Sequence, residues 1–173
     1  MKRKKGVSGF ALLLSAAVAT AAPAQQGAGV PHQQVISANP FGLLLELFNA
    51  EYERIVSRSS TAGLGGSFIS DDGEDYANAD VFWRFYPSEK PLEGWAFGVK
   101  VGITNVSALS ENEASEGTYL GYGFDVNRSW LLGPNDNFYT GVGFGLKRLI
   151  GVSDELALEV IPTIRIVNIG IAF

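Results

Sequence analysis

Alternation of side-chain size is the feature that most limits how this chain can fold. In Trp95–Thr104, aromatic and branched apolar residues occupy every second position, and the positions between them hold Ala, Gly, Lys or Thr. Successive side chains of a β-strand point to opposite faces of a sheet, so this segment presents one large apolar face and one small or charged face. Similar patterns recur in Ala77–Tyr86, Thr118–Arg128 and Phe138–Lys147. We therefore expect an all-β protein.

The N-terminal sequence has the layout of a secretory signal peptide. Four consecutive basic residues precede an apolar run, Phe10–Ala22, which leads into an A-x-A cleavage sequence at residues 22–24. An uncleaved membrane anchor is the alternative, but a spanning helix needs about 20 apolar residues. We expect a cleaved signal peptide over residues 1–24 and a polar periplasmic tail over residues 25–34. The folded domain would then occupy residues 35–173.

The C-terminal segment, Ile164–Phe173, is rich in β-branched residues and stops on an aromatic side chain. A terminal Phe suits a closing strand whose outward side chains sit in lipid. The segment resembles the insertion signal that the assembly machinery reads in bacterial outer-membrane proteins, which implies an assembly role for Phe173. Together with the signal peptide, it favours apolar side chains facing lipid over a soluble lipocalin-like barrel, in which they would point inward.

The number of strands follows from the positions of the turns. Such barrels end in the periplasm, so their connections alternate between the two sides when counted back from the C-terminus. An outward strand is needed before the strand that ends at Val56, and Val35–Leu43 is the candidate. We predict an eight-stranded antiparallel transmembrane β-barrel; one long bent strand before Val56 is the alternative. The predicted periplasmic turns are Ser57–Ser60, Pro87–Glu93 and Leu131–Asn137, and the predicted external loops are Asp71–Tyr76, Ala108–Gly117 and Gly151–Glu155.

One residue of the last strand breaks the alternation. Counted back from Phe173, every second position is apolar until Arg165 is reached. An arginine that faces the middle of a bilayer would cost about 2–4 kcal/mol. Two explanations remain open: Arg165 lies near the outer interface and extends toward it, or a bulge near Asn168 shifts the register.

Charged residues recur on the small face of several predicted strands. An eight-stranded barrel has an interior just wide enough for its own side chains, and an isolated buried ion is costly, so these charges must pair. We expect Arg84 and Lys100 to pair with some of the lumen carboxylates. The favoured interpretation is a salt-bridge plug, and the alternative is a gated path for ions or protons. The predicted lumen charge network is Glu51, Glu53, Asp80, Arg84, Lys100, Asp125 and Lys147.

Aromatic residues gather near the predicted strand ends. This placement is typical of the interfacial girdles of membrane barrels, although aromatic residues are also ordinary strand formers. The periplasmic set would be Tyr52, Tyr86, Trp95, Trp130, Phe138 and Tyr139, and the external set Tyr76 and Tyr119.

The stretch from Asn39 to Gly66 reads NPFGLLLELFNAEYERIVSRSSTAGLGG. With its NP-G-LL opening, its EYER sequence and its Gly-rich strand, the chain resembles an uncharacterised family of small Gram-negative outer-membrane barrels. Their general type is that of outer membrane protein A and the adhesion/invasion barrels. The resemblance covers nearly all of the mature chain and implies this fold and a location in the bacterial outer membrane. Its motifs are structural and imply no chemistry.

The composition disfavours several classes of function. The chain has no Cys and a single His, His32, which lies in the predicted tail, so neither a Ser–His hydrolase nor a transition-metal site is expected. The acidic run Asp71–Asp75 would at most hold Ca²⁺ loosely, and a solvated loop is the simpler interpretation. After residue 24 the chain has nine basic and 18 acidic residues, a net charge of −9. Such acidity argues against nucleic acid as a partner.

We therefore expect a non-enzymatic integral outer-membrane barrel with a structural or loop-mediated surface role. A small channel for ions or solutes is the main alternative. A membrane-embedded lipid-modifying enzyme and a soluble lipocalin-like binder are less favoured. No catalytic, cofactor-binding or metal-binding residue is assigned. The expected partners are outer-membrane lipid and the barrel assembly machinery, and any surface ligand of the external loops is unidentified.

Overall fold

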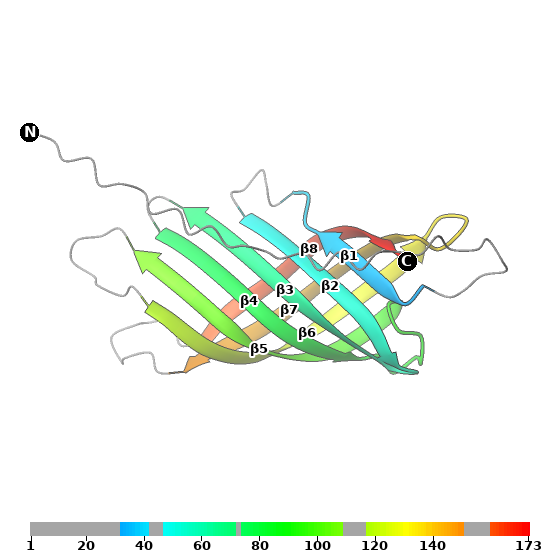
Figure 1. The fold of residues 1–173 in the computed structure, drawn as a ribbon, viewed down its shortest axis with the longest axis horizontal. Helices are drawn as coiled ribbons and strands as arrows, with labels where there is room; N and C mark the ends of the chain where they lie inside the picture. The colour runs from blue at the N-terminus through cyan, green and yellow to red at the C-terminus, as the bar shows by residue number, and fades with distance from the viewer. Residues whose placement is uncertain (1–31, 42–46, 72–73, 109–116, 151–159) are drawn as a thin grey trace, which may run out of the picture. The chain divides into compact units, whose positions relative to one another are not determined.

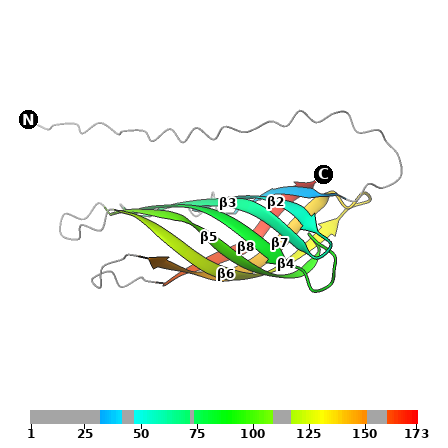
Figure 2. The same cartoon turned by 60° about the horizontal axis from the view of Figure 1, so that its bottom comes forward.

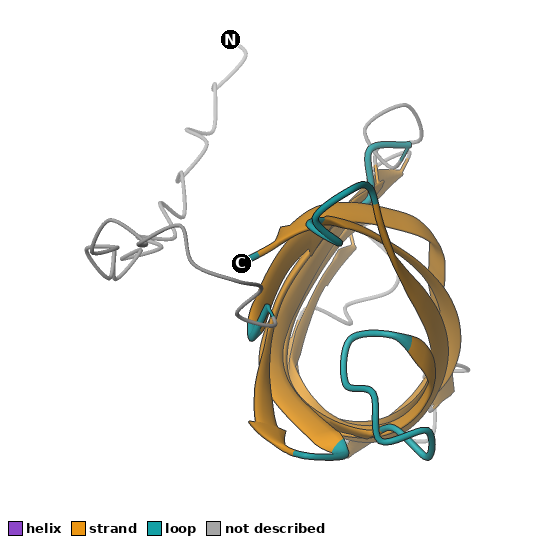
Figure 3. Cartoon of the chain, turned by 90° about the vertical axis from the view of Figure 1, so that its right-hand side faces the viewer, coloured by secondary structure: helices purple, strands orange, loops and turns teal. Residues whose placement is uncertain are grey.

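The computed structural model describes residues 32–41, 47–71, 74–108, 117–150 and 160–173. These residues form eight β-strands that close into a barrel in chain order (Figures 1 and 3). No helix in the described part of the chain is both long and apolar enough to span a bilayer. The strands are β1 (Gln34–Ala38), β2 (Leu47–Ser57), β3 (Ser60–Asp71), β4 (Glu74–Phe85), β5 (Gly94–Ala108), β6 (Gly117–Leu132), β7 (Phe138–Ile150) and β8 (Val160–Ala172).

This topology confirms the predicted eight-stranded antiparallel barrel. Each strand pairs antiparallel with the next, and β1 pairs with β8 to close the sheet. The strands are inclined to the barrel axis, as closure of a small sheet requires (Figure 2). The alternative of one long bent strand is wrong, because β1 and β2 are separate strands in which Gln34 lies opposite Arg54.

Three short turns lie at one end of the barrel, which we name the turn end, together with the start of β1 and the end of β8. They connect β2 to β3, β4 to β5 and β6 to β7, at the positions predicted from the sequence. Gly94 and Gly133 each have a φ of 93°, a conformation that glycine adopts without strain. In the second turn, Leu92 is buried in a cluster with Val35 and Tyr139. This turn therefore covers part of the opening at the turn end.

Two predicted boundaries differ from the structure. The first strand is Gln34–Ala38 rather than Val35–Leu43, and residues 42–46 lie outside the described residues. The predicted loop Asp71–Tyr76 is too long, because β3 and β4 stay paired up to Asp71 opposite Glu74. There the continuing hydrogen-bonded ladder outweighs the low strand propensity of acidic residues. The predicted signal peptide and most of the other two predicted external loops also fall outside the described residues.

The side chains are distributed inside out relative to a soluble protein. On β5, the residues from Trp95 to Ile103 that were predicted to face outward are 49–58 % exposed, whereas Ala96 and Thr104 are buried. The same alternation places Leu64 of β3, Trp83 of β4, Phe124 of β6 and Phe144 of β7 on the outer wall, whereas Phe82 and Leu149 are buried inside. This contradicts the lipocalin-like alternative, which needs its large apolar side chains inside. A closed sheet with an apolar exterior is the form in which β-strands cross a lipid bilayer.

A β-bulge in β8 resolves the position of Arg165. Asn168 pairs with Gly141, but the next pair is Arg165 with Gly143, so three residue steps on β8 oppose two on β7. The extra residue reverses the facing of the strand, and Arg165 points into the lumen with 6 % of its surface exposed. The bulge explanation is therefore confirmed, and the explanation that Arg165 extends to the outer interface is wrong.

Candidate functional site: the charged barrel interior

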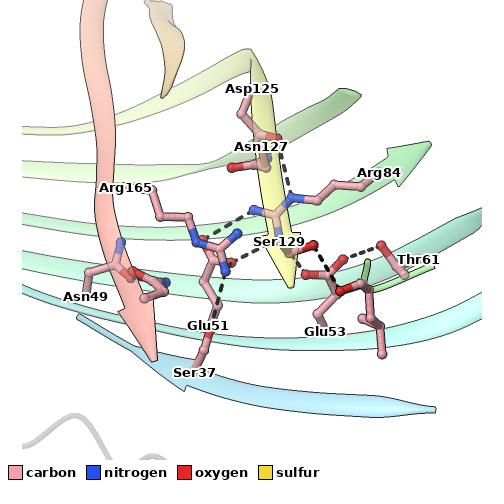
Figure 4. A network of polar contacts seen from close by, with 12 residues as sticks. Ser37, Asn49, Glu51, Glu53, Thr61, Arg84, Asp125, Asn127, Ser129 and Arg165 are labelled. Atoms are coloured by element: carbon pink, nitrogen blue, oxygen red, sulfur yellow. Dashed lines mark hydrogen bonds and ion pairs between the residues drawn. The ribbon is translucent and has the colours of Figure 1, made fainter. Parts of the chain in front are cut away.

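Arg84 on β4 is the centre of the largest polar network in the lumen (Figure 4). Its Nη1 lies 2.7 Å from Glu53 Oε2 and 3.0 Å from Glu51 Oε2, and its Nε lies 3.4 Å from Asp125 Oδ1. The guanidinium also rests 3.9 Å from the centre of the Phe82 ring. Only 2 % of the Arg84 side chain is exposed. Arginine keeps its charge and offers five donors, so one side chain can tie together carboxylates from β2 and β6.

Glu53 has further partners of its own. Thr61 donates its hydroxyl to Glu53 Oε1 at 2.6 Å, and Tyr86 donates its hydroxyl to the same oxygen at 2.7 Å. Asp125 accepts a hydrogen bond from the side-chain amide of Asn127. A buried carboxylate needs several donors to offset its lost hydration, and these neutral partners supply them beside Arg84.

Arg165 joins the same network from the opposite strand of the barrel wall. Its Nη2 lies 3.0 Å from Glu51 Oε2, so Glu51 bridges the two arginines. The same nitrogen donates to the Tyr139 hydroxyl at 3.2 Å and to Ser37 Oγ at 3.4 Å. The predicted network did not include Arg165, because strict alternation assigned it to the outer face. The break in its apolar pattern was the available signal.

A second cluster surrounds Lys147 on β7. Its Nζ lies 2.6 Å from Asp80 Oδ1 and also donates to the side-chain oxygen of Asn78. Thr104 Oγ1 donates to the same Asn78 oxygen at 3.3 Å. Lys147 is fully buried, so this single ion pair and its amide neighbour replace the water that would otherwise solvate the ammonium.

Lys100 is arranged differently from the other lumen cations. Its Nζ donates to Thr163 Oγ1 at 2.6 Å, and in the described part of the chain it makes no direct ion pair with Asp80, Asp125 or Glu51. The pairing of Lys100 with a carboxylate is therefore absent among the described residues. Lys100 still adds a positive charge to the lumen, where the described set has four carboxylates and four cations.

Glycines on the inner wall provide the space for these charged side chains. A Cβ atom added at Gly98 would overlap Asp125 Oδ1 and lie 3.0 Å from Arg84 Cγ. One added at Gly145 would lie 2.8 Å from Thr163 Oγ1 and 2.9 Å from Asp125 Cβ. The small face that the sequence pattern revealed is therefore small because long side chains from other strands occupy that volume.

The chemistry of the site is that of fixed charges. An arginine does not give up its proton in proteins, so a network centred on Arg84 holds charge and does not relay protons through that residue. The described residues contain no cluster of three or more acidic, His or Cys side chains arranged to hold a metal ion. His32 lies outside the network, with its Nε2 2.7 Å from the backbone oxygen of Asn135 in an exposed position.

The predicted aromatic girdle is wrong for four of its members. Tyr76 and Tyr119 occupy inward positions of β4 and β6, where Tyr119 lies opposite the buried Thr104 and the Tyr76 hydroxyl is buried. Tyr86 and Tyr139 are 1 % and 0 % exposed and belong to the lumen network. Proximity to a strand end does not determine the face that a residue occupies, because side chains alternate between the two faces of a strand. Trp95 and Phe138 do lie on the outer wall, with 51 % and 43 % of their surfaces exposed.

No protein-family model matches this chain, and no curated protein does. Among solved structures, it is similar to the N-terminal β-barrel domain of Pseudomonas aeruginosa OprF, with 15 % identity, coverage of 82 % of this chain and 98 % of that chain, and a TM-score of 0.47. It is also similar to the Yersinia pestis outer membrane protein Ail in a phospholipid bilayer nanodisc, with 15 % identity, coverage of 83 % and 100 %, and a TM-score of 0.48. The chain is an eight-stranded barrel of the outer-membrane type, because its own wall is apolar outside and charged inside.

Proposed function

We propose that this protein is a non-enzymatic outer-membrane anchor whose plugged barrel holds its external loops at the cell surface. The observation that carries the proposal is the Arg84 network, in which one buried guanidinium meets three carboxylates. These contacts cross the lumen and tie β2, β4 and β6 together, and Arg165 adds β8. Ion pairs and hydrogen bonds between strands stabilise a barrel, and the side chains that form them fill the space through which ions would pass.

Conductance in planar bilayers tests the plug. We expect the refolded wild-type protein to give no steady conductance and Arg84→Gln to raise the frequency of current events, because the variant leaves unpaired carboxylates that draw in water. Arg54→Gln is the matched control, since Arg54 is exposed on the outer wall and its loss leaves the lumen unchanged. Steady wild-type conductance would overturn the plug.

A small channel is the second candidate, and two observations favour it. Lys100 contacts a hydroxyl rather than a carboxylate. In addition, three buried side-chain atoms of the described residues, Tyr76 Oη, Arg165 Nε and Asn168 Oδ1, have no hydrogen-bond partner. Water or an ion at these positions would satisfy them. Cation-selective or anion-selective steady current that Lys100→Gln alters would favour this function over the anchor.

The non-enzymatic part of the proposal is supported by the position of the only histidine. His32 contacts a backbone oxygen at an exposed site, away from the lumen acids. Incubation of the refolded protein with radiolabelled phospholipid and lipid A should therefore give no hydrolysis or acyl transfer. Turnover that His32→Ala abolishes would contradict the proposal.

We also propose that the mature protein begins at Gln25 and that Phe173 acts in assembly with the barrel assembly machinery. The role of Phe173 is supported by its position at the closure of the barrel, where its carbonyl oxygen accepts hydrogen bonds from the backbone N–H groups of Gln33 and Gln34, both at 3.0 Å. Its side chain remains 51 % exposed and so accessible to a receptor. N-terminal sequencing of the outer-membrane fraction tests the first point. To test the assembly role, Phe173→Ala should lower the amount of folded protein in the membrane, and Phe173→Tyr should not. If Phe173→Ala and the wild type give equal amounts of folded protein, the assembly role is contradicted.

A further inference from the structure

Arg128 on β6 lies on the outer wall between two tryptophans. The centre of its guanidinium is 5.2 Å from the Trp95 ring centre and 5.3 Å from the Trp130 ring centre. Trp95 lies directly opposite Arg128 on β5, and Trp130 is two residues further along β6. Among the described residues, Arg128 has no carboxylate within ion-pair distance. The two rings hold the planar guanidinium group of Arg128 in place, and its hydrogen-bond donors have no carboxylate partner among the described residues.

A shallow apolar groove, largely open to its surroundings, runs beside Arg128 on the outer wall. The groove lies at the β8 bulge, where the register between Gly141 and Gly143 shifts and the wall is locally irregular. We name it the Arg128 groove; its outward side chains are Trp95, Val126, Arg128, Val142, Phe144 and Ile164.

The positive charge of Arg128 and the apolar side chains of the groove lie at different heights along the barrel. Arg128 lies opposite Val142, four residues before β6 ends at Leu132 at the turn end. The next outward row, away from the turn end, contains Phe144, which is paired with Ile164 on β8. A ligand in this groove would place an anion toward the turn end and an apolar chain toward the middle of the membrane.

We propose that the Arg128 groove binds an anionic glycerophospholipid from the leaflet nearer the turn end. Its phosphate would accept bidentate hydrogen bonds from Arg128, and one acyl chain would lie along Val142, Phe144 and Ile164. The guanidinium group of an arginine can donate two parallel hydrogen bonds to a phosphate, and tryptophans prefer the headgroup level of a bilayer. Arg128, Trp95 and Trp130 therefore lie at the depth of a phospholipid headgroup. This inference rests on the proposed insertion of the barrel in the outer membrane.

Quenching of tryptophan fluorescence by bromine-labelled lipids tests the site. In a Trp83→Phe background, the remaining tryptophans are Trp95 and Trp130, which flank Arg128. The barrel is refolded in phosphatidylcholine vesicles that contain a small fraction of brominated phosphatidylglycerol or, separately, of brominated phosphatidylcholine. We expect phosphatidylglycerol to associate about fivefold more strongly, which corresponds to ~1 kcal/mol.

Arg128→Gln should bring this preference down to about onefold, while Arg54→Gln, which removes another outward arginine near the turn end, should leave it unchanged. Equal association of the two lipids in the unsubstituted protein, or a preference that survives Arg128→Gln, would overturn the proposal. Suppression by excess inorganic phosphate in the buffer would also overturn it, because the site would then bind a soluble anion.

Failure of membrane insertion gives a different result from failure of the site. A barrel that is not inserted would show no quenching by either brominated lipid and no heat-dependent change in electrophoretic migration. An inserted barrel without the site would be quenched equally by both. Each variant is compared only after its folded fraction has been matched to that of the Trp83→Phe background.

Discussion

The inner and outer faces of the barrel wall obey opposite rules although they alternate along the same strands. On β4, Trp83 is 45 % exposed on the outer face, and the next residue, Arg84, is 2 % exposed inside. Lipid is an adaptable apolar solvent, so the outer face needs only to be apolar. The lumen has a fixed volume and fixed partners, so each inner side chain must match the size and charge of its neighbours. Substitutions at neighbouring positions of one strand should therefore destabilise the barrel for different physical reasons.

The largest effect should follow from removing the central lumen cation. Arg84→Ala leaves Glu53 and Asp125 buried without their charged partner, and it should lower the free energy of unfolding by about 3–5 kcal/mol. Replacing the charges together, as in Arg84→Met with Glu53→Gln and Asp125→Asn, should cost less than the single change, because Glu51 keeps its ion pair with Arg165. Denaturant unfolding in lipid vesicles measures both. A single variant that is as stable as the wild type would mean that water solvates the lumen charges.

A charge placed on the outer face should have the next largest effect. Val99 is 58 % exposed on β5, and Val99→Arg should lower the free energy of unfolding by about 2–4 kcal/mol near the middle of the bilayer. Val99→Leu, which keeps the site apolar, is the control and should be close to neutral. The measurement is again unfolding in vesicles, and a neutral arginine would show that this face does not contact lipid.

Added volume should distinguish the two faces without any change of charge. Gly98→Ala inserts a methyl group against Asp125 and Arg84, and it should cost about 1–3 kcal/mol through overpacking. Val99→Ile adds a methyl group to the adjacent outward position and should change stability by less than about 0.5 kcal/mol. If the two variants have equal unfolding midpoints, the lumen has spare room at Gly98.

The smallest expected effect concerns a neutral hydrogen bond in the lumen. Thr104 is fully buried and donates to Asn78, so Thr104→Val should cost about 1 kcal/mol. Thr140→Val changes an outward position on β7, opposite Trp130 and Ile169, and should stay within about 0.5 kcal/mol of the wild type. Equal stability of both variants would indicate that the lumen near Thr104 is hydrated.

The facing of the residues in the barrel wall could largely be predicted from the sequence, but the ion pairs of the lumen network could not. Alternation in Trp95–Thr104 predicted the outward and inward residues of β5, because side-chain facing depends only on strand geometry. The inward direction of Glu51 and Arg84 was accessible by the same rule. Which carboxylate meets which cation could not be predicted, because Arg84 and Glu53 are 31 residues apart and come together only when β2 and β4 both pair with β3.

What the sequence determined by itself is therefore local: the alternating faces, the turns at the turn end and the antiparallel order of the strands. The tertiary structure alone decided the extent of β1, the inward position of Arg165 and the contact of Lys100 with Thr163. The physical reason is that strand register is set between segments far apart in the chain. One extra residue in β8 reverses every side chain beyond it, and no local propensity in Pro162–Asn168 specifies where that residue falls.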